Sequence, residues 1–327
     1  MNFAISTFGF LKLLIKNFIL LVFFVFSQNS FALGSYELSE KLNNSTVRIN
    51  IWENYGTEYA EVLFGGSGIV FNKYRDTYFI LTNAHVVLSE YCLIDSDDDF
   101  CVDKAWDDSI SIMVDTTDSS YEYIVTEDSF IFWDDLDLAV IALAGSDFQD
   151  EIESFQMLEI GGLWHPLQQV YSAGFPFVIG NLKNYRDLFY DACVVNAGIF
   201  DEEGLFALYN YSIVHDCTIS GGMSGGPLVT EDGKLIAING LIGQPILEQG
   251  LLGAITSADY DNLNYAFAIH IYDLYSRVLL TDSGNFNPQS KFYNFLPRLA
   301  KEEHQVLYDF LLNDSSGDKR RLNRMFR

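Results

Sequence analysis

The chain has 327 residues, of which 49% are hydrophobic, 15% aromatic and 20% charged. This apolar content excludes a disordered protein, and the length fits one large domain or two small domains packed together. The 19 lysines and arginines are outnumbered by 45 acidic residues, which gives a formal charge of −26. A surface this negative repels phosphate backbones, so we expect no nucleic-acid partner.

The first 32 residues have the pattern of a secretory signal peptide. Two lysines precede the apolar run 18–26, and Ser30 and Ala32 are small residues at positions −3 and −1 of a cleavage site. A retained membrane anchor is the alternative, but the apolar run is short for a helix that spans a bilayer. We therefore expect residues 1–32 to be removed. The mature protein would then be periplasmic or secreted, without a stable membrane span.

Short runs of β-branched and aromatic residues recur from about residue 46 to residue 270. Clusters of Gly, Asn, Asp and Ser separate them, and no long helical periodicity intervenes. This pattern predicts an all-β sandwich or barrel rather than an α/β sheet. The polar, acidic region 145–153 is the expected joint between two halves of similar size. The clearest runs are Val47–Trp52, Gly68–Phe71, Tyr78–Thr82, Ile110–Val114, Leu138–Leu143, Val170–Ala173 and Leu235–Ile238.

Two of these runs adjoin residues suited to general base chemistry. His85 lies in the segment LTNAHVV, directly after the run that ends at Thr82, and Asp137 opens the apolar run 138–143. An imidazole can take a proton from a nucleophile, and a carboxylate on its other nitrogen fixes the tautomer. Asp134 and Asp135 compete for the role of that carboxylate. We prefer Asp137 because the apolar strand begins immediately after it.

Four cysteines, an even number in an exported chain, predict disulfides. Three pairings are possible, and we favour Cys92–Cys101 and Cys193–Cys217. The first pair brackets an acidic run at 95–99, and the second lies at the ends of two β-like runs that would form a hairpin. The acidic run lacks the glycine and the glutamate of an EF-hand loop, so we expect a solvated loop and no metal site.

A glycine-rich segment, SGGMSGGP at 220–227, supplies a candidate nucleophile. Its glycines allow a tight turn in which the amides of Gly222 and Ser224 point into one space and form an oxyanion hole. The same segment fits the G-x-S-x-G elbow of α/β-hydrolases, for which His270 or His304 would be the downstream histidine. The β-only pattern and the segment around His85 argue against this esterase alternative.

Helical spacing of apolar residues replaces the β pattern after Asn264. A short helix is expected over 272–279, a Gly/Asn/Pro-rich linker over 282–290, and further helical spacing over 299–311. Five of the last nine residues are lysine or arginine. This tail could dock on the acidic body of the protein or on an anionic surface. The alternative is a frayed terminus.

In this order, the three motifs around His85, Asp137 and Ser224 resemble those of the chymotrypsin-like (trypsin-fold) serine peptidases, in the bacterial branch that includes the HtrA-type proteases. Further likenesses are GSGIV at 66–70, AGFP at 173–176 and FAI at 267–269. The resemblance covers about residues 45–280, within a peptidase domain that we expect to span 33–280.

The resemblance implies two packed six-stranded antiparallel β-barrels, about 45–148 and 155–270. The helical spacing described above predicts a helical extension with a basic tail over 281–327. It places His85 and Asp137 in the first barrel and Ser224 in the second. The implied activity is that of an exported serine endopeptidase, which hydrolyses protein or peptide substrates through an acyl-enzyme and needs no cofactor. A non-catalytic binding protein on the same scaffold is the alternative.

The chain departs from the family pattern at two positions near the serine. Met223 replaces the aspartate that receives a freed N-terminus in the digestive enzymes, so we expect no activating cleavage beyond leader removal. Thr218 replaces the acid that selects Lys or Arg. We take His215, Thr218 and Asn239 as candidate substrate-binding residues, with a polar or acidic P1 residue and an apolar one both open. The extension is too short for the PDZ domain usual in HtrA proteins.

Overall fold

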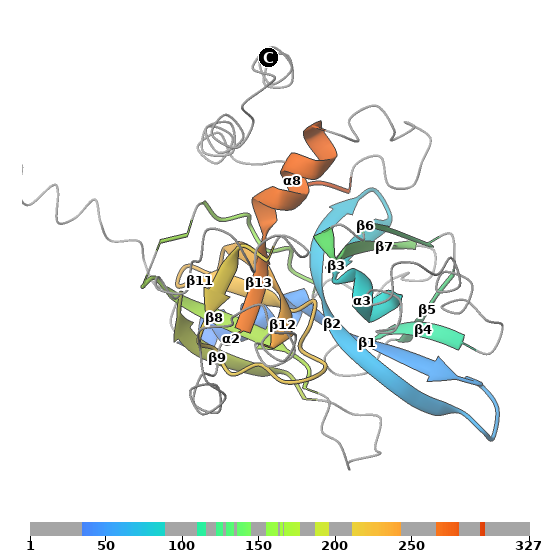
Figure 1. Ribbon diagram of the computed structural model, residues 1–327. Helices are drawn as coiled ribbons and strands as arrows, with labels where there is room; N and C mark the ends of the chain where they lie inside the picture. Colours follow the sequence, from blue (N-terminus) through green and yellow to red (C-terminus); the bar gives the residue numbers. More distant parts are fainter. Residues whose placement is uncertain are drawn as a thin grey trace, which may run out of the picture.

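The described part of the protein forms two antiparallel β sheets and three helices in a computed structural model (Figure 1). Both sheets curl, and they pack against each other through a shared apolar core. The described residues are 35–88, 110–115, 122–126, 129–133, 136–144, 155–162, 164–165, 167–176, 187–195, 211–242, 266–280 and 295–297.

The first sheet has seven strands in the order β5-β4-β1-β2-β3-β7-β6, with every neighbouring pair antiparallel. We predicted six strands for this half. The sheet has one strand more than that, and its two edge strands, β5 and β6, have only four residues each. The strands are β1 (Thr46–Glu53), β2 (Glu61–Tyr74), β3 (Thr77–Thr82), β4 (Ile110–Asp115), β5 (Glu122–Val125), β6 (Phe130–Trp133) and β7 (Leu138–Ala144).

The second sheet has six strands in the order β10-β13-β12-β11-β8-β9, again all antiparallel. Two antiparallel sheets with few helices confirm the predicted all-β class. The strands are β8 (Gln169–Gly174), β9 (Phe189–Val194), β10 (Ile213–His215), β11 (Pro227–Thr230), β12 (Leu235–Ile242) and β13 (Ala266–His270).

The two edge strands of the second sheet meet at a seam. An antiparallel bridge joins Val195, directly after β9, to His215 of β10. The predicted disulfide between Cys193 and Cys217 crosses the same seam. Cys92 and Cys101 lie outside the described residues, so their pairing stays a prediction.

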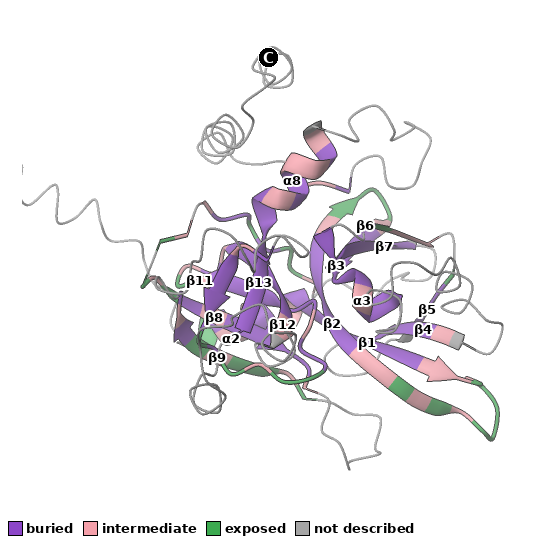
Figure 2. Ribbon diagram, in the orientation of Figure 1, coloured by how far each residue is buried: buried purple, intermediate pink, exposed green. Residues whose placement is uncertain are grey.

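Strand β2 is much longer than the predicted run Gly68–Phe71 because its first half extends the hairpin with β1. The pairing runs from Glu53↔Glu61 to Thr46↔Ile69. Figure 2 shows that the outer part of β2 is exposed or half-buried, whereas residues 66–71 are buried. This buried stretch contains Ser67, which is fully buried.

Three helices accompany the sheets: α2 (Ser35–Ser45), α3 (Ala84–Val87) and α8 (Ile271–Leu280). The sequence analysis did not predict α2, which precedes β1 and buries Leu38 and Leu42, one helical turn apart, in the core. Helix α8 follows β13 directly, close to the predicted range 272–279. Among the described helices, none has the length and apolarity needed to cross a membrane.

Side chains from both sheets share one apolar cluster. Phe79 and Leu138 of the first sheet and Ile238 and Phe267 of the second belong to it, and all four are buried. Such a core is as closely packed as an organic crystal, so it fixes the position of one sheet against the other. The proposed leader 1–32 and the joint 145–153 lie outside the described residues, as does most of 281–327.

Candidate active site

His85 is held where strand β3 turns into the one-turn helix α3. Asn83 keeps an extended backbone, with φ −79° and ψ 151°, and the helix begins at the next residue. Ala84, Val86 and Val87 are buried in the core of the first sheet, which anchors the helix. His85 points away from that core, and 16% of its side chain is exposed.

Pairing between β3 and β7 brings Asp137 to His85. Thr82 pairs with Ala139, so the residue after β3 and the residue before β7 emerge at the same end of the sheet. Asp137 has a left-handed backbone, with φ 48°, a conformation that aspartate tolerates better than most residues. Its carbonyl accepts hydrogen bonds from Ala84 N (3.1 Å) and from Asn83 Nδ2 (3.0 Å).

The Asp137 carboxylate forms two hydrogen bonds with His85. Oδ1 accepts from the His85 backbone N–H at 2.9 Å, and Oδ2 lies 2.7 Å from the ring Nδ1. The carboxylate is 3% exposed. Donation from Nδ1 to this carboxylate makes Nε2 the acceptor nitrogen of the ring. The arrangement therefore suits His85 to accept a proton at Nε2.

Ser224 lies in a turn that requires glycine at two positions. Gly222 and Gly225, on either side of Met223 and Ser224, have φ angles of 93° and 86°. A Cβ at Gly225 would overlap the Ser67 carbonyl oxygen, and one at Gly226 would overlap the Ala173 carbonyl oxygen. The glycines thus allow the turn to press directly against two strands.

Ser67 of β2 ties this turn to the first sheet. Its backbone N–H donates to the Ser224 carbonyl at 2.7 Å, and its hydroxyl donates to the Gly222 carbonyl at 2.8 Å. The same hydroxyl accepts from Phe175 N at 2.8 Å. Ser67 is fully buried, so these bonds are shielded from water. The GSG segment is therefore a contact between sheets, a role that its resemblance to a family motif did not reveal.

The Ser224 hydroxyl donates to the Gly240 carbonyl of β12 at 2.8 Å. It does not bond to the His85 ring, and the two side chains come from different sheets. A catalytic hydrogen bond that is long or absent in an empty site often forms only when substrate binds.

Tyr211, which the sequence analysis missed, contacts the same site. Its hydroxyl donates to Asp137 Oδ2, the oxygen that also faces His85 Nδ1. No pattern along the chain marks this tyrosine. The one available signal was Gly240, because a glycine inside a strand often marks the close approach of another group.

The three candidate substrate-binding residues differ in exposure. Thr218 is exposed, whereas His215 and Asn239 are fully buried in the second sheet. Burial lowers the pKa of His215 to about 4, although the Asn239 side chain and the charge of Asp216 act in the opposite direction. A neutral, buried imidazole offers no positive charge to an acidic substrate.

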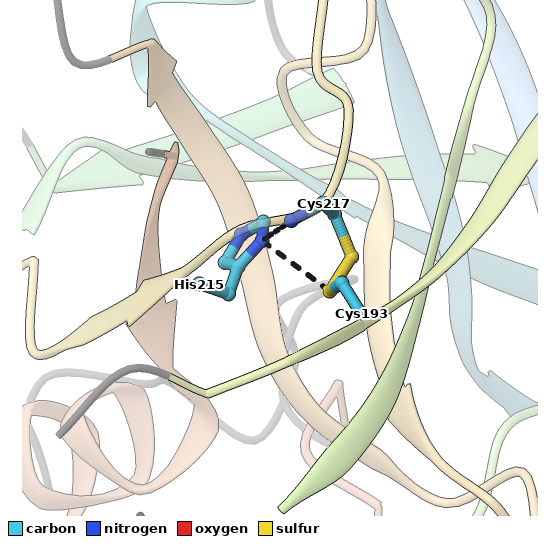
Figure 3. A group of neighbouring side chains, drawn as sticks. All are labelled: Cys193, His215 and Cys217. Carbon is cyan, nitrogen blue, oxygen red and sulfur yellow. Dashed lines mark hydrogen bonds between the residues drawn. A yellow bond between two sulfur atoms is a disulfide. The ribbon is translucent and has the colours of Figure 1, made fainter. Parts of the chain in front are cut away.

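His215 lies beside the Cys193–Cys217 disulfide (Figure 3). Its Nδ1 accepts from Cys217 N at 3.3 Å and lies 3.9 Å from Cys193 Sγ. The two sulfur atoms are bonded to each other, so they are not thiolate ligands, although the three residues lie close enough to hold a metal ion. Asp216 and Asp191 add further bonds across the seam, to Val194 N and to Thr218 N, both at 2.8 Å.

Comparison with protein families gives a match to the trypsin-like peptidase domain over residues 66–238. This range is more than half of the chain and contains His85, Asp137 and Ser224. The chain belongs to the trypsin-like peptidase family. No curated protein matches it at a significant level. The predicted family and the peptidase class of hydrolase are thereby confirmed.

Proposed function

We propose that this trypsin-like peptidase is an exported serine endopeptidase, with Ser224 as nucleophile, His85 as general base and acid, and Asp137 as the acid that orients His85. The observation that carries the proposal is the buried Asp137 carboxylate, which lies 2.7 Å from His85 Nδ1 and also binds the His85 backbone. A base held at two points is already oriented for proton transfer.

In the proposed reaction, Ser224 Oγ attacks the carbonyl carbon of the scissile peptide while its proton passes to His85 Nε2. The tetrahedral intermediate collapses, the C–N bond breaks, and His85 gives the proton to the leaving amine. Water then attacks the acyl-enzyme with His85 again as base, which releases the acid product and restores Ser224. The Asp137 carboxylate stabilises the imidazolium in both halves.

The Ser224 hydroxyl has to leave the Gly240 carbonyl before it can bond to His85. Exchanging one hydrogen bond for another is nearly neutral, because a single intramolecular bond contributes only about 0.5–1.5 kcal/mol net. Breaking the bond to Gly240 is therefore a small part of the barrier. The amides of Gly222 and Ser224 are the proposed donors to the oxyanion, a contribution of about 2.7–4 kcal/mol in other hydrolases.

No activating cleavage is needed in this proposal beyond removal of the leader 1–32. Met223 is fully buried beside Ser224, and a thioether cannot form an ion pair with a new N-terminus. The Cys193–Cys217 disulfide is compatible with an oxidising compartment. Proteins or peptides are the proposed substrates, with Thr218 as the exposed candidate at the P1 pocket.

A fluorophosphonate probe together with casein hydrolysis tests the proposal. The mature wild-type protein should be labelled and should cleave casein without further processing, and Ser224→Ala and His85→Ala should abolish both. Ser220→Ala is the matched control, because this serine lies in the same segment and its hydroxyl contacts only Met223 Sδ, at 3.8 Å.

Two results would point to the alternatives. A wild-type protein that neither reacts nor cleaves would favour a binding protein on a peptidase scaffold. Labelling that survives His85→Ala but disappears in His304→Ala would favour an esterase.

A further inference from the structure

We infer that Tyr211 is a positioning residue of this site: its hydroxyl holds the Asp137 carboxylate, from the opposite sheet, in the orientation that His85 requires. The inference rests on the proposed function, since it assigns a role within the same group of residues. Tyr211 lies two residues before β10 of the second sheet, whereas Asp137 directly precedes β7 of the first sheet.

The contact is buried and specific. Tyr211 and Asp137 are each 2% exposed, and the phenol donates to Oδ2. With the two bonds from His85, the carboxylate has three contacts, two at Oδ2 and one at Oδ1. The two His85 bonds come from a single residue, which lies just beyond β3 of the first sheet. A third bond, from a rigid aromatic ring on another element, restricts rotation of the carboxylate about its Cβ–Cγ bond.

Gly240 makes room for this tyrosine. A Cβ at Gly240 would lie 2.6 Å from Tyr211 Cζ and closer still to Cε1 and Oη, a distance that side chains do not tolerate. The carbonyl of the same residue accepts the Ser224 hydroxyl at 2.8 Å. Gly240 therefore links the two sides of the site, since it holds the resting nucleophile and admits the ring that reaches Asp137.

The phenol also disperses the charge of the carboxylate. A hydrogen bond donated to Oδ2 draws negative charge toward the tyrosine and reduces what is available to stabilise a protonated His85. Removing the hydroxyl should therefore have two effects at once. The Asp137–His85 pair becomes less well oriented, which lowers kcat, and His85 becomes easier to protonate.

Tyr211→Phe tests both effects with almost no change in shape. We expect kcat for peptide hydrolysis to fall about tenfold to hundredfold, the size expected for loss of a hydrogen bond to a charged group, with KM nearly unchanged. The acidic limb of the kcat/KM profile should move to higher pH. Tyr171→Phe is the matched control, because that tyrosine lies on β8 of the same sheet and accepts only from Gln169 Nε2, at 3.1 Å.

Gly240→Ala provides a second, independent readout. In the wild-type background the new methyl group displaces the Tyr211 ring and should lower kcat at least as much as Tyr211→Phe. In a Tyr211→Ala background the methyl group meets no ring, so the further loss caused by Gly240→Ala should be at least fivefold smaller.

Three outcomes are distinguishable. A fall in kcat with a shifted acidic limb, together with the smaller Gly240→Ala penalty in the Tyr211→Ala background, supports the positioning role. A Tyr211→Phe variant with unchanged kcat and pH profile, or with lower stability but the same profile, overturns it. A wild-type protein that a fluorophosphonate does not label overturns the proposed function itself.

Discussion

The two halves of the candidate site are built in different ways. His85 and Asp137 lie just beyond the ends of two adjacent strands of one sheet, β3 and β7, and four hydrogen bonds between 2.7 and 3.1 Å join Asp137 to the segment 83–85. The Ser224 turn belongs to the other sheet, where β12 holds it through the bonds Gly225 N to the Asn239 carbonyl and Asn239 N to the Gly226 carbonyl. Ser67 adds two bonds to the turn from the first sheet. The proposed base and its acid are thus assembled within one sheet, whereas the turn of the proposed nucleophile also depends on how the two sheets are docked.

The largest effects should come from the local pair. His85→Ala removes the base and should lower kcat about 10⁶-fold, whereas Asp137→Asn keeps the base but presents the wrong tautomer and should cost about 10⁴-fold. Steady-state hydrolysis of a peptide substrate measures both. Equal losses in the two variants would contradict the assignment of Asp137 as an orienting residue only.

Removing the disulfide should weaken the nucleophile's half selectively. The bridge joins residues 24 apart, so Cys193→Ser with Cys217→Ser should lower the free energy of unfolding by about 3–4 kcal/mol in urea titrations. Because the seam lies in the Ser224 sheet, the rate of fluorophosphonate labelling should fall while the acidic limb set by His85 stays in place. If the acidic limb of the pH profile moved while the labelling rate stayed the same, the disulfide would act on the His85 half of the site rather than on the Ser224 half.

Acid should also act mainly on the second half. His215 and His270 lie on strands of that sheet, β10 and β13. Burial lowers the pKa values of both histidines to about 4. In the unfolded chain these histidines take up protons below about pH 6.5, whereas in the folded protein they stay neutral down to about pH 4. The stability that they contribute is therefore complete above about pH 6.5 and is lost as the pH falls toward about 4. As the pH falls through this window, each of the two histidines should lower the free energy of unfolding by about 1.4 kcal/mol per pH unit.

Urea titrations between pH 4 and pH 7 measure this slope. His215→Gln and His270→Gln should each reduce the proton uptake on unfolding by about one. A slope that neither substitution changes would show that other groups cause the acid sensitivity.

The smallest effect is expected at the contact between sheets. Ser67→Ala leaves the buried Phe175 N–H and Gly222 carbonyl without this hydroxyl, and should lower the free energy of unfolding by about 1–3 kcal/mol. It should also slow labelling of Ser224. Thr57→Ala, which removes an exposed hydroxyl bonded to the Asn54 carbonyl, should change stability by less than about 0.5 kcal/mol and leave labelling unchanged. Identical effects of the two substitutions would contradict the role of Ser67.

What the sequence could predict follows the same division. The β class, the 193–217 disulfide and the strand ends near His85 and Asp137 were readable because they depend on local patterns. Strand β2 was predicted too short because its exposed half gains its pairing from β1, a contact that no residue within β2 encodes.

Tyr211 and the bonds of Ser67 were not predictable for a related reason. Each reaches its partner only after the two sheets have packed, so the partner lies far away in sequence: 74 residues separate Tyr211 from Asp137, and 155 separate Ser67 from Gly222. A single sequence carries no periodic signal over such separations. Gly240 was the one local trace of this packing.

The central claim is that Ser224 becomes nucleophilic only when His85 acts on it. Fluorophosphonate labelling of the mature protein, with intact mass to locate the adduct, tests it most directly. We expect one adduct per chain, on Ser224, which is absent in Ser224→Ala and in His85→Ala and retained in Ser220→Ala. An adduct on another residue, or full labelling of Ser224 without His85, would contradict it.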